Sequence, residues 1–207
     1  MTDNVINSFI LLFVVVDPIG VASLFCAITH GYSVKAARAA ALRGVTVAFF
    51  IIVGFILGGS ALLKYLGVTM PAFTIAGGIL LLLLAIDMVV VRQSGLRTAT
   101  QSEQHEAEHK ADISVFPLAI PMIAGPGTLT TVLLLTGEHG WSRQTAETVG
   151  VVAVVLLVSL ILLLLARSIQ RALGETGVNV IVRVFGILLA ALAVQYISNG
   201  IRHMLEL

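Results

Sequence analysis

The sequence predicts an all-α membrane protein: six transmembrane helices that form two inverted three-helix repeats, with helices 1 and 4 broken at the bilayer midplane. Three observations lead to this prediction: the composition, the spacing of apolar stretches and an internal repeat. Of the 207 residues, 58% are hydrophobic and 11% are charged, whereas soluble domains are about 25% charged. Because so few charges cannot cover a surface in water, we expect lipid to cover much of this one.

Six apolar stretches are each about long enough to cross the hydrocarbon core, which takes roughly 20 helical residues. They cover residues 5–29, 44–63, 71–91, 113–136, 149–166 and 178–201. No Lys or Arg precedes the first stretch, so it lacks the basic region of a secretory signal peptide. The long polar segment 92–112 divides the chain into a first repeat at 1–91 and a second repeat at 113–207.

Lysine and arginine residues are unevenly distributed between the two ends of these stretches. Eight follow the first, third or fifth stretch, and three lie on the opposite side. The eight are Lys35, Arg38, Arg43, Arg92, Arg97, Lys110, Arg167 and Arg171, and the three are Lys64, Arg143 and Arg202. Cytoplasmic loops are enriched in Lys and Arg. We therefore expect a cytoplasmic linker at 92–112 and both termini outside the cytoplasm.

An internal repeat appears at one fixed offset along the chain. The step from Gly78 to Gly186 has the same length as the step from Pro18 to Pro126, and we call this shared distance the repeat offset. Five positions near Gly78 have identical residues at the repeat offset. Each half holds three stretches, and an odd number makes the second half enter the membrane from the opposite side. Many secondary transporters share this inverted arrangement.

The segments 17–20 and 125–128 combine proline with glycine in the middle of the first and fourth stretches. Proline removes a backbone donor and clashes with the preceding turn, so each segment predicts a helix break. The freed backbone groups must face protein or a wet cavity, and each half-helix that follows begins with a partial positive charge. A proline kink repaired by neighbouring helices is the alternative. The candidate substrate-binding residues are Asp17, Pro18, Ile19, Gly20, Ser23, Gly125, Pro126, Gly127, Thr128 and Thr131.

Four side chains within the apolar stretches are candidates for an ionic, binding or gating role: Asp17, Asp87, Arg183 and Gln195. A carboxylate at a helix centre costs about 2.5–3.5 kcal/mol on the insertion scale, so Asp17 is expected either to cap the half-helix behind it or to bind a cation or ammonium group. Asp87 and Gln195 are related by the repeat offset. Asp87, Arg183 and Gln195 are candidate gating or ion-pair residues, with snorkelling to the membrane surface as the alternative.

The linker contains His105, Glu106 and His109 in an H-E-x-x-H pattern, which on a helix can bind zinc. A zinc site also needs a third ligand and a shielded position, and this polar segment offers neither. We therefore expect no metal and no cofactor.

The segments VVVDPIG (14–20), FTIAGGILLLLLAIDM (73–88) and FPLAIPMIAGPGTLTTV (116–132) resemble the MarC family of bacterial integral membrane proteins. The order and spacing of these segments fit the family over almost the whole chain. The family is grouped with LysE-type exporters, and its relatives include transporters of small neutral amino acids such as glycine and alanine. The resemblance implies transport and leaves substrate and direction open.

These observations together predict a transporter rather than an enzyme. We expect a secondary transporter of small solutes, most of all small neutral amino acids such as glycine or alanine, that works by alternating access. A proton or Na⁺ gradient would drive it, or it would act as a uniporter. Its expected partners are the solute and the lipid bilayer, and nucleic acid is not expected. Whether the protein forms a homo-oligomer is left open by the sequence. The alternatives are a structural or regulatory membrane protein without transport and, much less favoured, a metalloprotease that uses the linker histidines.

Overall fold

A computed structural model describes residues 2–90, 113–137 and 142–205, and these residues are helical without any strand. The elements are α1 (Thr2–Val16), α2 (Pro18–Ile28), α3 (Val34–Tyr65), α4 (Met70–Val90), η1 (Ser114–Ile123), α6 (Pro126–Thr136) and α7 (Arg143–Met204). Helix α7 turns sharply at Gly174, so it consists of two long helices, Arg143–Gly174 and Thr176–Met204.

Five helical segments of the described chain are long and apolar enough to cross a membrane. The bent pair of η1 and α6 raises the number to six if it counts as one span. The other spans are Asn4–Ile28, Val34–Tyr65, Met70–Val90, Arg143–Gly174 and Thr176–Met204. The predicted all-helical membrane class is therefore confirmed.

Some helices extend well beyond their apolar stretches. Helix α3 begins at Val34, well before the predicted start at 44, because Ser33 caps it by accepting a hydrogen bond from the Ala36 N–H at 3.2 Å. The helix Arg143–Gly174 likewise exceeds the predicted 149–166 at both ends. Hydropathy marks only the part of a helix that lies in hydrocarbon, whereas caps decide where the helix ends.

The segment η1 is less regular than the continuous helix predicted for the start of the fourth stretch. Phe116 and Ile120 adopt extended backbone angles, and each precedes a proline. Proline pushes the residue before it away from the helical region, which explains both positions. Between η1 and α6 the chain bends by 54°.

The fifth and sixth spans are joined by a sharp turn at Gly174. Gly174 has φ 65° and ψ 173°, a conformation open mainly to glycine. The sequence analysis placed a connecting segment at 167–177, but the structure continues the helix to Gly174 and resumes it at Thr176.

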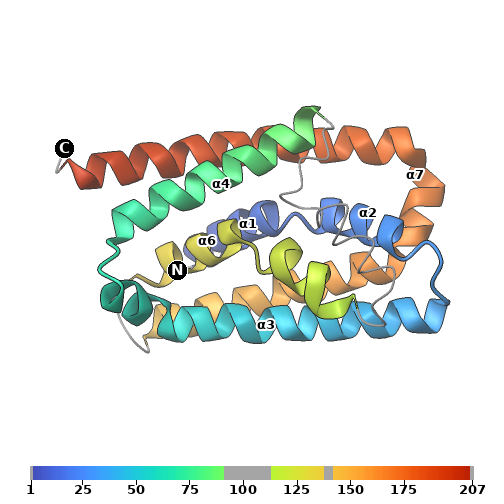
Figure 1. The fold of residues 1–207 in the computed structure, drawn as a ribbon, viewed down its shortest axis with the longest axis horizontal. Helices are drawn as coiled ribbons and strands as arrows, with labels where there is room; N and C mark the ends of the chain where they lie inside the picture. Colours follow the sequence, from blue (N-terminus) through green and yellow to red (C-terminus); the bar gives the residue numbers. More distant parts are fainter. Residues whose placement is uncertain (1, 91–112, 138–141, 206–207) are drawn as a thin grey trace.

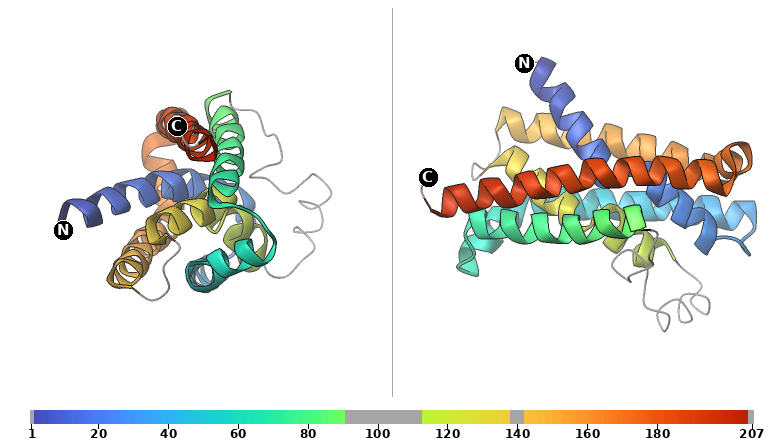
Figure 2. Two further views of the ribbon diagram at one scale, coloured as in Figure 1. Left: turned by 90° about the vertical axis from the view of Figure 1, so that its left-hand side faces the viewer. Right: turned by 90° about the horizontal axis from the view of Figure 1, so that it is seen from above.

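The helices form three layers (Figure 1). Helices α4 and Thr176–Met204 lie together on one side, and α3 and Arg143–Gly174 lie on the other. Between them lie α1, α2, η1 and α6, as the end-on view in Figure 2 also shows. The beginning of α1 and the end of α7 lie toward the same end of the long axis. The interrupted segments thus lie between two layers of continuous helices.

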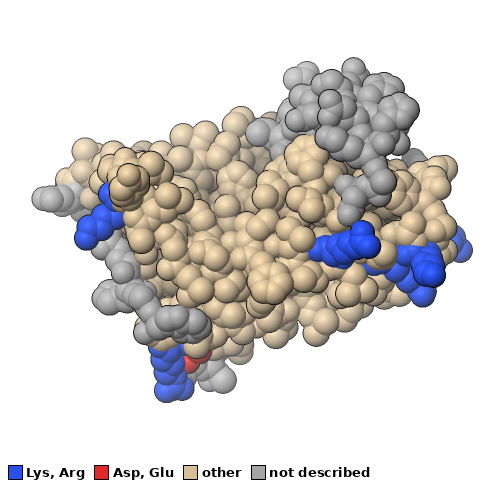
Figure 3. All heavy atoms as spheres, turned by 60° about the horizontal axis from the view of Figure 1, so that its bottom comes forward, with Lys and Arg blue, Asp and Glu red and all other residues tan. Residues whose placement is uncertain are grey.

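Charged side chains gather toward the two ends of the molecule. In Figure 3 lysine and arginine appear near both ends of the long axis, with an uncharged band between them. Large apolar side chains such as Phe50, Leu157 and Ile187 are exposed on the described surface. A belt of exposed apolar side chains between charged ends is what a membrane-embedded surface requires.

The contact between α4 and the second half of α7 is reciprocal at the repeat offset. A Cβ atom on Gly78 would lie 2.9 Å from the Ala193 carbonyl oxygen and 2.8 Å from Ile197 Cγ1. A Cβ atom on Gly186 would lie 3.2 Å from the Ala85 carbonyl oxygen and 3.0 Å from Val89 Cγ2. Each position in the first contact has its counterpart in the second at the repeat offset: 78 with 186, 85 with 193, and 89 with 197.

Gly54 and Gly58, unlike Gly78 and Gly186, do not lie at a contact between helices. Their spacing suggested close helix packing, but nothing lies within 4 Å of a Cβ atom built on either one. Both are exposed on α3, so that expectation is wrong within this chain.

We expect Gly78→Ala to lower the thermal unfolding midpoint of the protein in detergent. The new methyl group would force backbone apart, and overpacking costs about 1–3 kcal/mol, more than the roughly 0.5–1 kcal/mol gained by removing a helical glycine. The matched control is Gly54→Ala, where only the gain applies. A midpoint for Gly78→Ala equal to or above that of Gly54→Ala would contradict the reciprocal contact.

Candidate functional site

The first helix break is a single residue. Helix α1 ends at Val16, and Asp17 adopts a left-handed conformation with φ 47° and ψ 66° before α2 begins at Pro18. Asp17 is 0% exposed, and its Oδ1 accepts a hydrogen bond from the Gly20 N–H at 3.1 Å. The side chain therefore caps α2, one of the two roles expected for it. Its binding of an ion or substrate stays a prediction.

At the second break, a threonine side chain forms a hydrogen bond with a backbone carbonyl that the break leaves free. The chain leaves η1 at Ala124, and α6 begins at Pro126 with Gly125 in an extended conformation. Thr128 donates its hydroxyl hydrogen to the Ile123 carbonyl oxygen at 2.9 Å. A carbonyl freed by the bend thus finds a partner inside the protein, as a buried backbone group must.

Thr131 joins the second break to the last span. Its Oγ1 lies 2.8 Å from the Gly127 carbonyl oxygen and 2.9 Å from the Tyr196 hydroxyl. Because a threonine hydroxyl has one hydrogen and Gly127 can only accept it, Tyr196 is the donor in the second bond. Tyr196 is not among the residues predicted from the sequence for this site. The available signal was a tyrosine inside an apolar stretch, since buried tyrosine hydroxyls usually find a partner.

Thr130 differs from its neighbours on α6. Its Oγ1 is buried and has no hydrogen-bond partner within the described part of the chain. The side chain packs directly against Gly77 of α4, where a Cβ atom would clash with it. Helices α4 and α6 therefore pack closely against each other at Gly77 and Thr130.

The two breaks approach each other beside a small cavity. A Cβ atom on Gly127 would lie 3.3 Å from Val15 Cγ1, two residues before Asp17. The cavity measures about 50 Å³ and is lined by Val15, Leu80, Leu81, Leu84, Pro121, Met122, Gly125, Pro126, Gly127 and Thr128. Pockets for drug-sized ligands usually measure about 300–1,000 Å³, so this cavity is small by comparison.

The candidate binding residues thus fall into separate groups. Residues 125–128 line the small cavity, although Pro126 is itself exposed. Ile19 and Ser23 line a different cavity of about 160 Å³ between α2 and α7. Pro18 and Gly20 are buried beside Asp17. The structure brings the second-break residues together and places Ser23 apart from them.

The candidate gating residues lie at different exposures. Asp87 is half-buried on α4, whereas Arg183 is exposed on α7. Gln195 is also exposed and donates from Nε2 to Asn199 Oδ1 at 2.7 Å. Gly186 packs against Met88, so the turns that carry Asp87 and Arg183 lie near each other. A gate formed by these residues stays a prediction.

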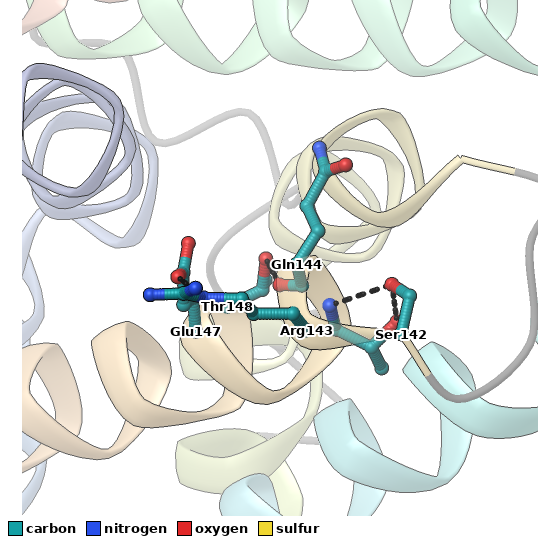
Figure 4. A network of polar contacts seen from close by, with 6 residues as sticks. Ser142, Arg143, Gln144, Glu147 and Thr148 are labelled. Atoms are coloured by element: carbon teal, nitrogen blue, oxygen red, sulfur yellow. Dashed lines mark hydrogen bonds and ion pairs between the residues drawn. The ribbon is translucent and has the colours of Figure 1, made fainter. Parts of the chain in front are cut away.

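A larger cavity, not predicted from the sequence, opens toward the end of the molecule where the chain termini lie. It measures about 550 Å³, and its lining includes Asn4, Asn7 and Ser8 of α1 and Arg143, Gln144, Glu147 and Thr148 of α7. Figure 4 shows part of this wall, where Arg143 Nε pairs with Glu147 Oε1 at 3.0 Å. Gln144 Nε2 donates to the Leu135 carbonyl oxygen of α6 at 2.7 Å. Leu135 of α6 also lines this cavity.

Metal ligands are not gathered in the described part of the chain, where no group of three His, Cys, Asp or Glu residues could hold an ion. His105 and His109 lie outside the described residues.

The sequence profile described as "MarC family integral membrane protein" matches residues 2–205. The chain belongs to the MarC family. This family resemblance was expected from the sequence, and it is confirmed. No solved structure matches the chain.

Alignments with three relatives cover nearly the full length of this chain and of each relative. The chain is 36% identical over 205 residues to the UPF0056 membrane protein YvbG of Bacillus subtilis, covering 99% of this chain and 97% of that protein. It is 32% identical over 204 residues to a UPF0056 membrane protein of Aquifex aeolicus, covering 97% and 94%. It is 30% identical over 200 residues to the UPF0056 inner membrane protein YhgN of Escherichia coli, covering 97% of each. This MarC family member is therefore an integral membrane protein.

We expect Asp17→Asn to keep most of the stability and Asp17→Ala to lose about 1–3 kcal/mol. Asparagine retains a side-chain oxygen for the cap and tolerates the left-handed conformation, whereas alanine does neither. Thermal unfolding of both purified variants in one detergent measures the difference. Equal losses for asparagine and alanine would show that the charge, rather than the cap and the backbone angle, stabilises this break.

Proposed function

We propose that this MarC family protein is a secondary transporter of small neutral amino acids, such as glycine or alanine, that works by alternating access. The observation that carries the proposal is the reciprocal packing of its two halves around a pair of helix breaks. A proton or Na⁺ gradient drives transport, or the protein acts as a uniporter.

The reciprocal contacts support an inverted repeat. Where a twofold axis relates two segments, a contact between positions i and j recurs between j and i. The contacts of Gly78 and Gly186 follow this rule at the repeat offset. The apolar cluster around them holds further partners at the same offset: Leu81 and Leu189, Ala85 and Ala193, Met88 and Tyr196.

The layers support the same interpretation. Each layer contains corresponding spans from both halves, and the middle layer contains the first and fourth (Figure 1). Transporters built from inverted repeats bind solute near the midplane, where interrupted helices meet. We place the substrate site between Asp17 and the segment 125–128.

The chemistry of the breaks suits a zwitterion. The first turns of α2 and α6 carry the partial positive charge of a helix N-terminus, which favours a carboxylate. The Asp17 carboxylate and carbonyl oxygens near the breaks favour an ammonium group. Gly125 and Gly127 leave room only for a small side chain, because Leu81 and Val15 already contact Gly127.

Transport through this region would require the small cavity to enlarge. Leu80, Leu81 and Leu84 of α4 form one wall of the 50 Å³ cavity beside residues 125–128. Movement of α4 away from α6 would enlarge it, and the larger cavity of about 550 Å³ offers an approach from the end where the chain termini lie. Alternating access then takes the form of one repeat moving against the other.

Uptake into proteoliposomes tests the proposal directly. With a panel of radiolabelled amino acids, we expect the wild-type protein to take up glycine or alanine and Asp17→Asn to insert and fold but lose most uptake. The control is Glu175→Gln at the turn of α7, which also replaces one carboxylate by an amide and should retain uptake.

Two results would count against this assignment. No uptake of any amino acid by folded wild-type protein would favour a structural or regulatory membrane protein. Wild-type uptake and affinity in folded Asp17→Asn would leave Asp17 with its capping role alone.

We expect the chain termini to lie outside the cytoplasm of a bacterial inner membrane, because more basic residues lie at the opposite end of the spans. In a Cys26→Ser background, a cysteine at Leu207 should react with an impermeant thiol reagent added outside intact spheroplasts. A cysteine at Lys35 should react only after lysis. The reverse labelling would overturn the orientation.

A further inference from the structure

A second cavity lies at the end of the spans opposite the chain termini. It measures about 160 Å³ and is enclosed by the end of α2, the beginning of α3 and the helix Arg143–Gly174. Three arginines line it, Arg38, Arg167 and Arg171, and no Asp or Glu is among its described lining residues. Figure 3 shows lysine and arginine side chains gathered toward this end.

The three arginines differ in their hydrogen bonding. Arg167 Nη2 donates to the carbonyl oxygens of Thr29 and Tyr32, each at 2.8 Å. These bonds satisfy carbonyls beyond the last turn of α2, so Arg167 is structural. Arg38 and Arg171 are exposed, and neither has a hydrogen bond or ion pair with another described residue. Two cations at one cavity, with no carboxylate among its described lining residues, favour an anion as ligand.

An apolar stripe leads into the same cavity. Leu157, Ile161 and Leu164 are 58%, 47% and 41% exposed. They are spaced four and three residues apart, and Ser168 and Arg171 continue the same spacing. Residues three and four apart share one helix face. From Leu157 to Arg171 this face therefore extends about 20 Å along the axis, apolar at one end and cationic at the other.

We propose that this cavity binds the phosphate headgroup of an anionic phospholipid, with one acyl chain along Leu157, Ile161 and Leu164. Basic pockets between transmembrane helices bind such headgroups. A soluble phosphate offers the same anionic chemistry but leaves the apolar stripe without a ligand group, so the surface matches a lipid. This inference does not depend on transport or on which side of the membrane the cavity faces.

Lipid titration of purified protein tests the proposal. The unfolding midpoint is followed in a neutral detergent with added phosphatidylglycerol, phosphatidylcholine or inorganic phosphate. We expect phosphatidylglycerol alone to raise the midpoint. The double variant Arg38→Gln with Arg171→Gln should bind phosphatidylglycerol about tenfold more weakly or worse. Arg167 is left intact because its loss would release α2.

A matched control removes the same charge elsewhere. Lys64→Gln with Arg202→Gln takes away two cations at the opposite end of the spans and should keep the wild-type response. Native mass spectrometry gives an independent readout: we expect one phosphatidylglycerol adduct retained by wild type and by this control, and lost from the Arg38 and Arg171 double variant.

Three outcomes would overturn the proposal. The same shift with inorganic phosphate would indicate a soluble-anion site. Equal loss in both double variants would indicate unspecific charge attraction. An unchanged response in the Arg38 and Arg171 double variant would show that the cavity is not the binding site.

Discussion

The requirement that every backbone polar group find a partner away from water governs this structure. Both helix breaks satisfy it with side chains from their own surroundings: Asp17 accepts from the Gly20 N–H, and Thr128 donates to the Ile123 carbonyl. The same requirement operates at helix ends, where Arg167 closes the end of α2 and Gln144 caps a carbonyl of α6. Broken helices can therefore occupy the middle layer because side chains bond the groups that the breaks release.

Small residues set how closely the two halves approach. Gly78 and Gly186 bring backbone against backbone where α4 meets the last span, and Gly77 and Gly127 allow close contact where α4 meets α6. In lipid, such packing replaces the hydrophobic effect as the force between helices. Helix α4 thus forms part of the reciprocal interface and one wall of the small cavity, so a movement of α4 would affect both.

Much of the architecture could be predicted from the sequence, because hydropathy reports which segments lie in hydrocarbon and proline marks where a helix must stop. The helix ends could not be predicted, since caps such as Ser33 act outside the apolar stretches. Gly174 was taken as part of a connection because a glycine among polar residues is typical of loops. At the candidate site, the break residues follow from composition, but the bond between Thr131 and Tyr196 joins positions far apart along the chain, which no local pattern encodes.

The buried hydroxyl of Thr130 has an energetic consequence for the packing of α4 against α6. A buried polar group without a partner costs about 1–3 kcal/mol, and this cost exists only while Gly77 covers the hydroxyl. Any arrangement that lets water or a solute reach Thr130 removes it. Relative to a protein with alanine at this position, this cost would favour any separation of α4 and α6 by a factor of about 5–150. The contact between α4 and α6 thus carries an energetic cost that comes from one oxygen atom, Thr130 Oγ1, which has no partner in the described part of the chain.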